Sequence, residues 1–157
     1  CSDYESGGYQ ICNGFIAISN GGLFGKGLGN STQKYLYLPE AHTDFIFPII
    51  VEEIGVLGAT VVLLMYILLL FRLLKISKEA STIRGSIIAY GTFCYITIHL
   101  AINLLGIHAL IPLTGVPVPF LSYGGSFLMN VLLLMFVNER IAIETNIHKE
   151  NQIIRSL

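Results

Sequence analysis

The sequence contains few charged residues, and this shortage excludes an ordinary soluble domain. Asp, Glu, Lys and Arg make up 12% of its 157 residues, whereas they make up about a quarter of a soluble domain. Hydrophobic residues make up 54% of the chain, and the mean hydropathy is +0.70. We therefore expect an integral membrane protein.

The chain also lacks a basic surface and a cysteine framework. Its formal net charge is -1, and no run of Lys and Arg could follow a phosphate backbone, which excludes a nucleic-acid partner. The three cysteines, Cys1, Cys12 and Cys94, are too few and too scattered for a disulfide framework, and no CxxC or HExxH spacing predicts a metal site. We expect all three to be ordinary structural residues.

A signal peptide is missing from the start of the chain, because no basic stretch precedes an apolar one there. The chain begins at Cys1 without an initiator methionine and opens on a polar segment. We therefore expect the C-terminal part of a longer protein.

Residues 1–44 are rich in Gly, Ser, Asn and Tyr and show no sustained hydrophobic period. They predict an irregular loop outside the membrane, with short helices at Gly14–Ser19 and Thr32–Leu36. The glycines do not form a GxxxxGK(S/T) motif, so a nucleotide-binding loop is not predicted. Lys26 and Lys34 on this backbone could receive an anionic ligand or could be solvated lysines, and the sequence leaves both interpretations open.

Three apolar stretches predict membrane-spanning helices. Their expected bounds are residues 45–74, 85–111 and 122–138, with loops at 75–84 and 112–121 and a charged tail at 139–157. The hydrophilic stretch Phe71–Arg84, which includes the end of the first span and the connection to the second, holds Arg72, Lys75, Lys78 and Arg84 against Glu79 alone. The positive-inside rule places this connection in the cytoplasm, so the loops at 1–44 and 112–121 should lie outside.

A cluster of ionisable residues adjoins the outer end of the first span, in the stretch YLPEAHTDFIFPIIVEE. The cluster consists of Glu40, His42, Asp44, Glu52 and Glu53. A carboxylate is costly at the edge of hydrocarbon, so the cluster indicates a functional site. Helix capping is the alternative for Asp44, because Pro48 has no N–H to bond back to the Asp44 carbonyl and the helix should start at or just after that proline.

The second span carries one polar stripe. Thr92, Tyr95, His99 and Asn103 recur there at helical spacing. Such stripes usually make hydrogen bonds between helices, and we favour that role over chemistry. In the third span, Gly124 and Gly125 should lie in the upper turns and allow close helix approach.

Two long stretches resemble the SEDS family (shape, elongation, division and sporulation), which includes FtsW, RodA and SpoVE. They are GGLFGKGLGNSTQKYLYLPEAHTDFIFPIIVEEIGVLG at Gly21–Gly58 and PLTGVPVPFLSYGGS at Pro112–Ser126. Their sequences are most similar to the division-type branch, FtsW. The resemblance implies a ten-helix membrane bundle, of which this all-α chain would be the last large outer loop and the final three helices. Phe127, where the family often has Ser, and Pro48, where it commonly has Ala, depart from the pattern.

The resemblance also implies an activity. The family polymerises lipid II, a disaccharide peptide linked to undecaprenyl pyrophosphate, into glycan strands outside the bacterial plasma membrane. It works with a class B penicillin-binding protein and other membrane proteins of the division machinery. A fragment without the preceding helices should be inactive alone.

Asp44 matches the proposed catalytic aspartate of the family. Glycosyl transfer needs a base for the attacking hydroxyl and charge stabilisation for the pyrophosphate, and a divalent cation, Mg or Mn, could contribute the latter. The expected substrate-binding residues are Lys26, Lys34, Glu40, His42, Ser122, Tyr123, Gly124 and Gly125. The expected supporting residues are Glu52, His99 and Asn103.

Two other functions stay open on the sequence. A lipid II flippase would use acids and the polar stripe as a path across the bilayer, and a scaffold would only organise the division machinery. Because the ionisable residues gather at one face and not through the spans, we favour the enzyme. The stripe keeps the flippase as an alternative.

Overall fold

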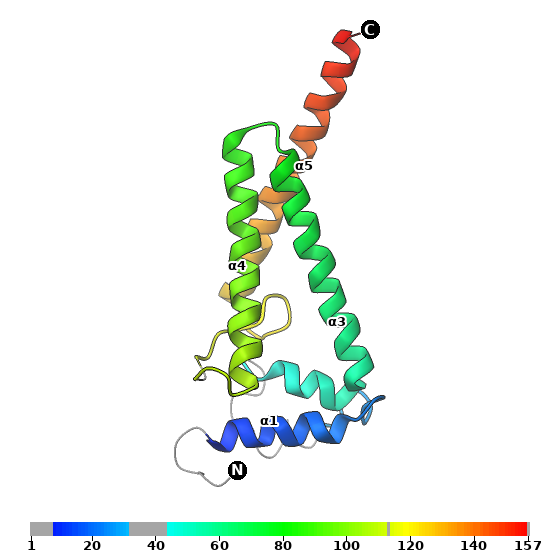
Figure 1. Ribbon diagram of the computed structural model, residues 1–157, viewed down its shortest axis with the longest axis vertical. Coiled ribbons are helices and arrows are strands. Elements are labelled where there is room, and N and C mark those ends of the chain that lie inside the picture. The colour runs from blue at the N-terminus through cyan, green and yellow to red at the C-terminus, as the bar shows by residue number, and fades with distance from the viewer. Residues whose placement is uncertain (1–7, 32–43, 113, 157) are drawn as a thin grey trace. The chain divides into compact units, whose positions relative to one another are not determined.

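All elements in the described part of the chain are helices (Figure 1). The computed structural model describes residues 8–31, 44–112 and 114–156. The helices are α1 (Gly8–Gly21), α3 (Ile46–Glu79), α4 (Ile83–Ile107) and α5 (Gly125–Ser156). The last three are long and apolar enough to cross a membrane. The predicted all-α membrane fold with three spanning helices is therefore confirmed.

The chain divides into two compact units. The first contains Cys1–Met65 and His99–Gly124, and the second contains Tyr66–Ile98 and Gly125–Leu157. Asp44 belongs to the first unit.

Two helices extend beyond the bounds expected from the sequence. Residues 75–79 continue α3, although a loop was predicted there, and α5 starts at Gly125 and runs through most of the predicted tail. Charge marks where a span leaves hydrocarbon, but Lys, Arg and Glu are good helix formers and do not end a helix. Pairs one turn apart even support these ends, as Arg140 Nε and Glu144 Oε1 do at 3.0 Å.

The second unit is joined by polar contacts between its helices. Asn138 Nδ2 on α5 donates to Thr92 Oγ1 on α4 at 2.9 Å. Near the other end of α5, Lys149 Nζ contacts Glu79 Oε2 at 2.7 Å. The expectation that the polar stripe makes interhelical hydrogen bonds is thus confirmed for Thr92.

Helix α1 is longer than the short helix predicted at Gly14–Ser19. The other helix predicted for this segment, at Thr32–Leu36, lies outside the described residues. Cys12 on α1 is disulfide-bonded, and Cys94 is a free thiol. The expectation of three ordinary structural cysteines did not include this disulfide of Cys12, because sequence spacing alone does not show which cysteines meet in space.

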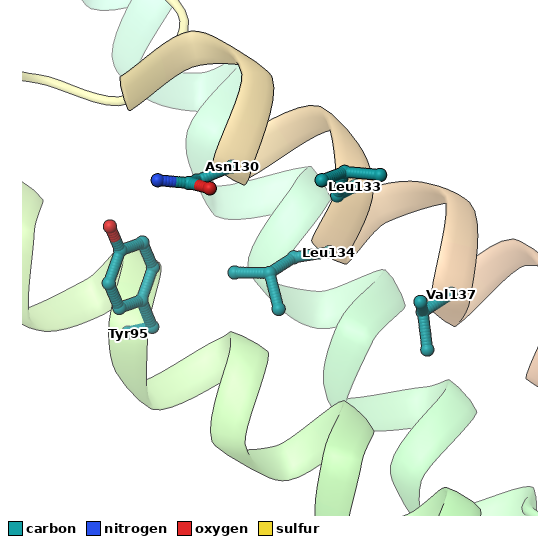
Figure 2. Close-up of a pocket in the computed structure, with 5 residues that line it drawn as sticks. All are labelled: Tyr95, Asn130, Leu133, Leu134 and Val137. Atoms are coloured by element: carbon teal, nitrogen blue, oxygen red, sulfur yellow. The ribbon is translucent and has the colours of Figure 1, made fainter. Parts of the chain in front are cut away.

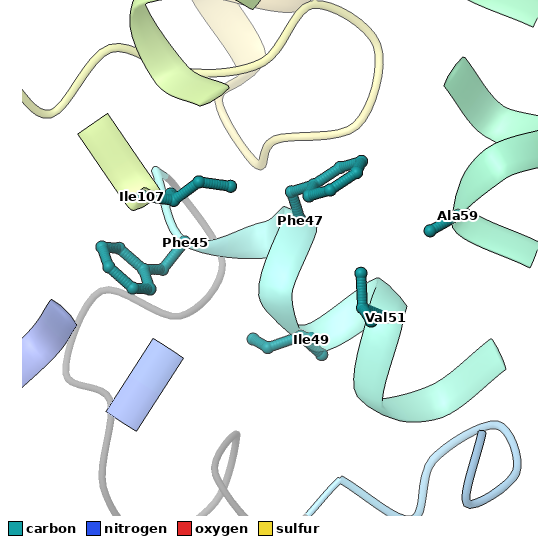
Figure 3. Close-up of a cluster of buried hydrophobic side chains, with 6 residues drawn as sticks. All are labelled: Phe45, Phe47, Ile49, Val51, Ala59 and Ile107. Atoms are coloured by element: carbon teal, nitrogen blue, oxygen red, sulfur yellow. The ribbon is translucent and has the colours of Figure 1, made fainter. Parts of the chain in front are cut away.

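The core of the first unit surrounds the start of α3. Its buried residues are Phe45, Phe47, Ile49, Val51, Ala59 and Ile107 (Figure 3). Helix α1 packs closely on this start, since a Cβ at Gly14 would lie 2.5 Å from Phe45 Cε1. The residue that follows Asp44 is therefore fixed by packing.

Candidate active site

Helix α3 is broken at Gly55, shortly after the two adjacent glutamates. Gly55 has φ 75° and ψ 176°, a region of backbone space that is essentially restricted to glycine. The break separates a half-helix, residues 46–54, from the longer apolar part of α3. The change of direction is visible in Figure 1. Asp44 lies just before the half-helix.

An insertion loop, residues 22–27, fills the break. In a continuous helix the amides of Val56 and Leu57 would bond to the carbonyls of Glu52 and Glu53. Here both amides and both carbonyls bond to the loop instead, so these backbone groups at the break are satisfied. The bonds are Val56 N to Gly22 O (3.0 Å), Leu57 N to Leu23 O (3.3 Å), Lys26 N to Glu52 O (2.9 Å) and Gly27 N to Glu53 O (2.9 Å).

The insertion loop approaches so closely that side chains do not fit. A Cβ at Gly55 would lie 2.3 Å from Leu23 O, and one at Gly25 would lie 2.3 Å from Glu53 O. Both glycines also have positive φ. Gly25 and Gly55 therefore allow close backbone-to-backbone packing at the break.

A buried carboxylate anchors the same loop. Glu52 is fully buried, and its Oε1 lies 3.0 Å from Lys26 Nζ while its Oε2 accepts a hydrogen bond from Ser31 Oγ. A buried charge is costly unless it is paired and hydrogen-bonded, so these three residues act as one unit. The pairing favours a structural role for Lys26, whose side chain is 35% exposed, over the predicted contact with substrate.

The backbone of Asp44 is held from α4. Asn103 Nδ2 donates to Asp44 O at 2.7 Å and to Val116 O at 2.8 Å. Asp44 itself is partly exposed, whereas the adjacent Phe45 is completely buried. The predicted supporting role of Asn103 thus has a defined geometry, and the backbone of the candidate base is fixed while its residue stays accessible.

The first residues of α3 show where Asp44 lies relative to the helix start, which matters for its alternative role as a helix cap. The first helical residue is Ile46, so Phe45 occupies the N-cap position and Asp44 precedes it. Pro48 lies in the first turn, where its missing N–H has no intrahelical partner in any case. The helix therefore starts two residues earlier than Pro48.

A small cavity adjoins Asp44 and provides only about 10 Å³ of space, roughly the room of one water molecule. It is lined by Asp44, Ile102, Asn103, Gly106, Ile107, Thr114, Gly115 and Val116. A sugar would need a pocket of several hundred Å³. Substrate therefore cannot occupy this cavity as it stands.

The predicted substrate-binding turn, residues 122–125, combines a buried serine with an exposed tyrosine. Ser122 is buried, and its Oγ accepts a hydrogen bond from Val118 N at 2.7 Å. Tyr123 is 81% exposed. Gly125 begins α5, and a Cβ added there would meet no atom within 4 Å among the described residues. Of this turn, Tyr123 alone presents a large exposed side chain.

Three predicted site residues, Lys34, Glu40 and His42, lie outside the described residues. His99 is half-buried on α4. Among the residues that the structure does describe, no three His, Cys, Asp or Glu side chains gather to hold a metal. The divalent cation and these site residues stay predictions.

A larger open pocket of about 400 Å³ lies within the second unit (Figure 2). Tyr95 of α4 faces it together with Asn130, Leu133, Leu134 and Val137 of α5. No charged residue of the described chain lines this pocket. Its lining does not suit the pyrophosphate of a lipid precursor.

Sequence reasoning missed the break, the insertion loop and the role of Ser31. The available signal was a glycine inside an apolar helical run, at Gly55, together with the closely spaced glycines at Gly21–Gly29. Neither signal shows on its own that the two segments meet.

The comparisons with known proteins agree with this architecture. A family model for cell cycle proteins, FTSW_RODA_SPOVE, matches residues 1–147. The chain is 48% identical over 130 residues to stage V sporulation protein E of Bacillus subtilis (83% of this chain, 35% of the relative). It is similarly 48% identical over 130 residues to the probable peptidoglycan glycosyltransferase FtsW of Bacillus subtilis (83% and 32%), and 45% identical over 134 residues to that of Enterococcus hirae (85% and 33%).

The chain spans about a third of the length of these curated relatives. The match with the family model extends over both units and all the described helices except the last residues of α5. The chain belongs to the FtsW, RodA and SpoVE family of multi-pass membrane proteins.

Proposed function

We propose that this chain carries the catalytic aspartate of a peptidoglycan glycosyltransferase, which polymerises lipid II into glycan strands for septal wall synthesis during cell division. The observation that carries the proposal is Asp44, a partly exposed acid whose backbone is clamped by Asn103 at the start of a broken helix. Relatives named probable peptidoglycan glycosyltransferases support it. The activity belongs to the full-length protein.

In this mechanism Asp44 removes the proton from the attacking sugar hydroxyl as the new glycosidic bond forms. Undecaprenyl pyrophosphate leaves with its electron pair and needs charge stabilisation but no general acid. Lys34, His42 and Glu40, as well as Tyr123, are the proposed substrate contacts, and a divalent cation, Mg or Mn, could assist. A class B penicillin-binding protein and other division proteins are the proposed partners.

The reaction is proposed for the extracytoplasmic face. The basic residues around the turn between α3 and α4 favour the cytoplasm for that turn, and Asp44 lies at the other end of the apolar part of α3. The disulfide of Cys12 on α1 supports the same orientation, because disulfides persist in oxidising compartments.

Cysteine labelling tests this orientation. In a Cys94→Ser background, a cysteine at Leu28 should react only from outside and one at Ser81 only from the cytoplasm, since both positions are exposed. Ser31 and Ser77 are unsuitable because both are buried and hydrogen-bonded. Labelling of both chosen positions from one side would contradict the proposed face.

The polar stripe no longer favours the flippase. Asn103 and Thr92 hydrogen-bond to protein partners, and the pocket beside Tyr95 is mostly apolar. These two residues of the stripe therefore serve packing between segments, which weakens the support that the stripe gave to the flippase.

The function is tested in proteoliposomes that contain lipid II, the full-length protein and a class B penicillin-binding protein. We expect glycan strands, which are released from the lipid and then detected. Labelled lipid II should move between leaflets no faster than in liposomes without the protein. Faster movement without strands would indicate the flippase. If neither glycan strands nor faster lipid II movement is observed, the scaffold function is favoured.

A further inference from the structure

The amide of Asn103 joins two segments that are far apart in the sequence. Its nitrogen has two hydrogens, and each has a carbonyl acceptor: Asp44 O at 2.7 Å and Val116 O at 2.8 Å. Asn103 is only 5% exposed. We propose that Asn103 is a positioning residue for glycosyl transfer, which holds Asp44 against the loop at residues 114–116; this inference rests on the proposed role of Asp44.

The two hydrogen bonds donated by the Asn103 side-chain nitrogen set the orientation of the amide. The amide oxygen, Oδ1, is buried and has no hydrogen-bond partner among the described residues. A buried acceptor without a donor costs free energy, so the two bonds of the nitrogen must offset this cost. The residue is thus held in one rotamer by the two carbonyls that it joins.

Asn103 acts through the backbone of Asp44 and not on the substrate. The cavity that the two residues share has about 10 Å³ of space, which is far too small for a sugar. The Asp44 carbonyl precedes the helical residues of α3, so a partner outside the helix has to fix it. Burial of Phe45 fixes the next residue, and together the two constraints set where the Asp44 side chain starts.

A base must be held close to its working position. A misplacement of about 1 Å can lower the rate about 100-fold. Loss of the two hydrogen bonds that Asn103 donates, here called the clamp, should therefore reduce turnover. Substrate affinity depends on other contacts and should change little. This pattern differs from that of a general loss of stability.

Asn138 provides a matched control within the same chain. It is also buried, its Nδ2 also donates two hydrogen bonds, to Thr92 Oγ1 (2.9 Å) and Leu134 O (2.7 Å), and its Oδ1 also has no partner among the described residues. Its bonds lie within the second unit and do not involve Asp44. Substituting either asparagine by leucine removes two hydrogen bonds donated by a buried Nδ2.

The experiment measures lipid II polymerisation by the full-length protein with its class B penicillin-binding protein. Asn103→Leu should lower kcat about 10- to 100-fold with KM changed less than about 3-fold. Asn138→Leu should leave kcat within about 3-fold of the wild type. Its melting temperature should fall by about as much as that of Asn103→Leu. Equal kcat values for the two variants would overturn the positioning role.

Three further variants keep the outcomes distinguishable. Asp44→Asn reports on the proposed function: if it polymerises normally, that function fails, whereas an inactive Asp44→Asn beside a fully active Asn103→Leu rejects the clamp alone. If Asn103→Leu does not fold, the pair Asn103→His and Asn138→His replaces the two leucine variants, because the imidazole retains one N–H donor. Asn103→His should then show the lower kcat, and equal values would again reject the clamp.

Discussion

Replacing Gly55 by alanine should destabilise the full-length protein by at least about 3 kcal/mol and abolish its activity. The backbone conformation of Gly55 costs another residue about 1–3 kcal/mol. The new Cβ would also lie 2.3 Å from Leu23 O, which forces the insertion loop out of the break and breaks hydrogen bonds worth about 0.5–1.5 kcal/mol each. Thermal unfolding in detergent and protease cleavage within residues 22–27 measure the effect.

Gly29→Ala is the control for this substitution. Gly29 has a similar φ of 81°, but nothing lies within 4 Å of its added Cβ among the described residues. It therefore carries only the conformational cost of a left-handed residue, about 1–2 kcal/mol. If Gly55→Ala were as mild as Gly29→Ala, the insertion loop would not depend on close backbone packing at the break.

The three spans could be predicted because each depends on local composition. An apolar run long enough to cross hydrocarbon is visible in a single window of sequence, and helices of sufficient length are found at each place. Helix ends were harder, since the charged residues at 75–79 and beyond Asn138 leave the apolar run but continue the helix. The break at Gly55 was not predicted because its bonds come from residues about 30 positions earlier in the chain.

The candidate site was predicted in part. The edge position of Asp44 and its match to a family aspartate made it the candidate base, which stays a prediction, and the helical spacing of the stripe indicated Asn103 as a hydrogen-bonding residue. Neither could show that Asn103 bonds to the backbone of Asp44 itself. Lys26 was expected near substrate, but its pairing with Glu52 depends on the fold of the insertion loop and is not visible in the sequence.

Replacing Asp44 by asparagine should lower polymerisation about 1,000-fold, because a general base typically contributes about 10²–10⁴-fold to the rate. Asparagine is nearly the same size and can still accept a hydrogen bond at a helix start. Its backbone carbonyl can also keep the bond from Asn103. The protein should therefore remain folded, with a melting temperature close to that of the wild type.

Glu144→Gln is the matched control for loss of a carboxylate. Glu144 is exposed on α5 and pairs with Arg140 one turn away, and such surface pairs contribute only about 0.3–0.5 kcal/mol. Its polymerisation rate should equal that of the wild type. A loss of activity in Glu144→Gln would show that the assay responds to charge in general.

Steady-state rates combine binding, chemistry and release, so the base role of Asp44 requires a rate for the chemical step. The most direct measurement is a single turnover: transfer of one disaccharide from labelled lipid II to a preformed glycan strand, with both saturating and the class B penicillin-binding protein present. We expect Asp44→Asn still to bind both substrates but to transfer the disaccharide about 1,000 times more slowly than the wild type. Transfer within about threefold of the wild-type rate would contradict the role of Asp44 as the base.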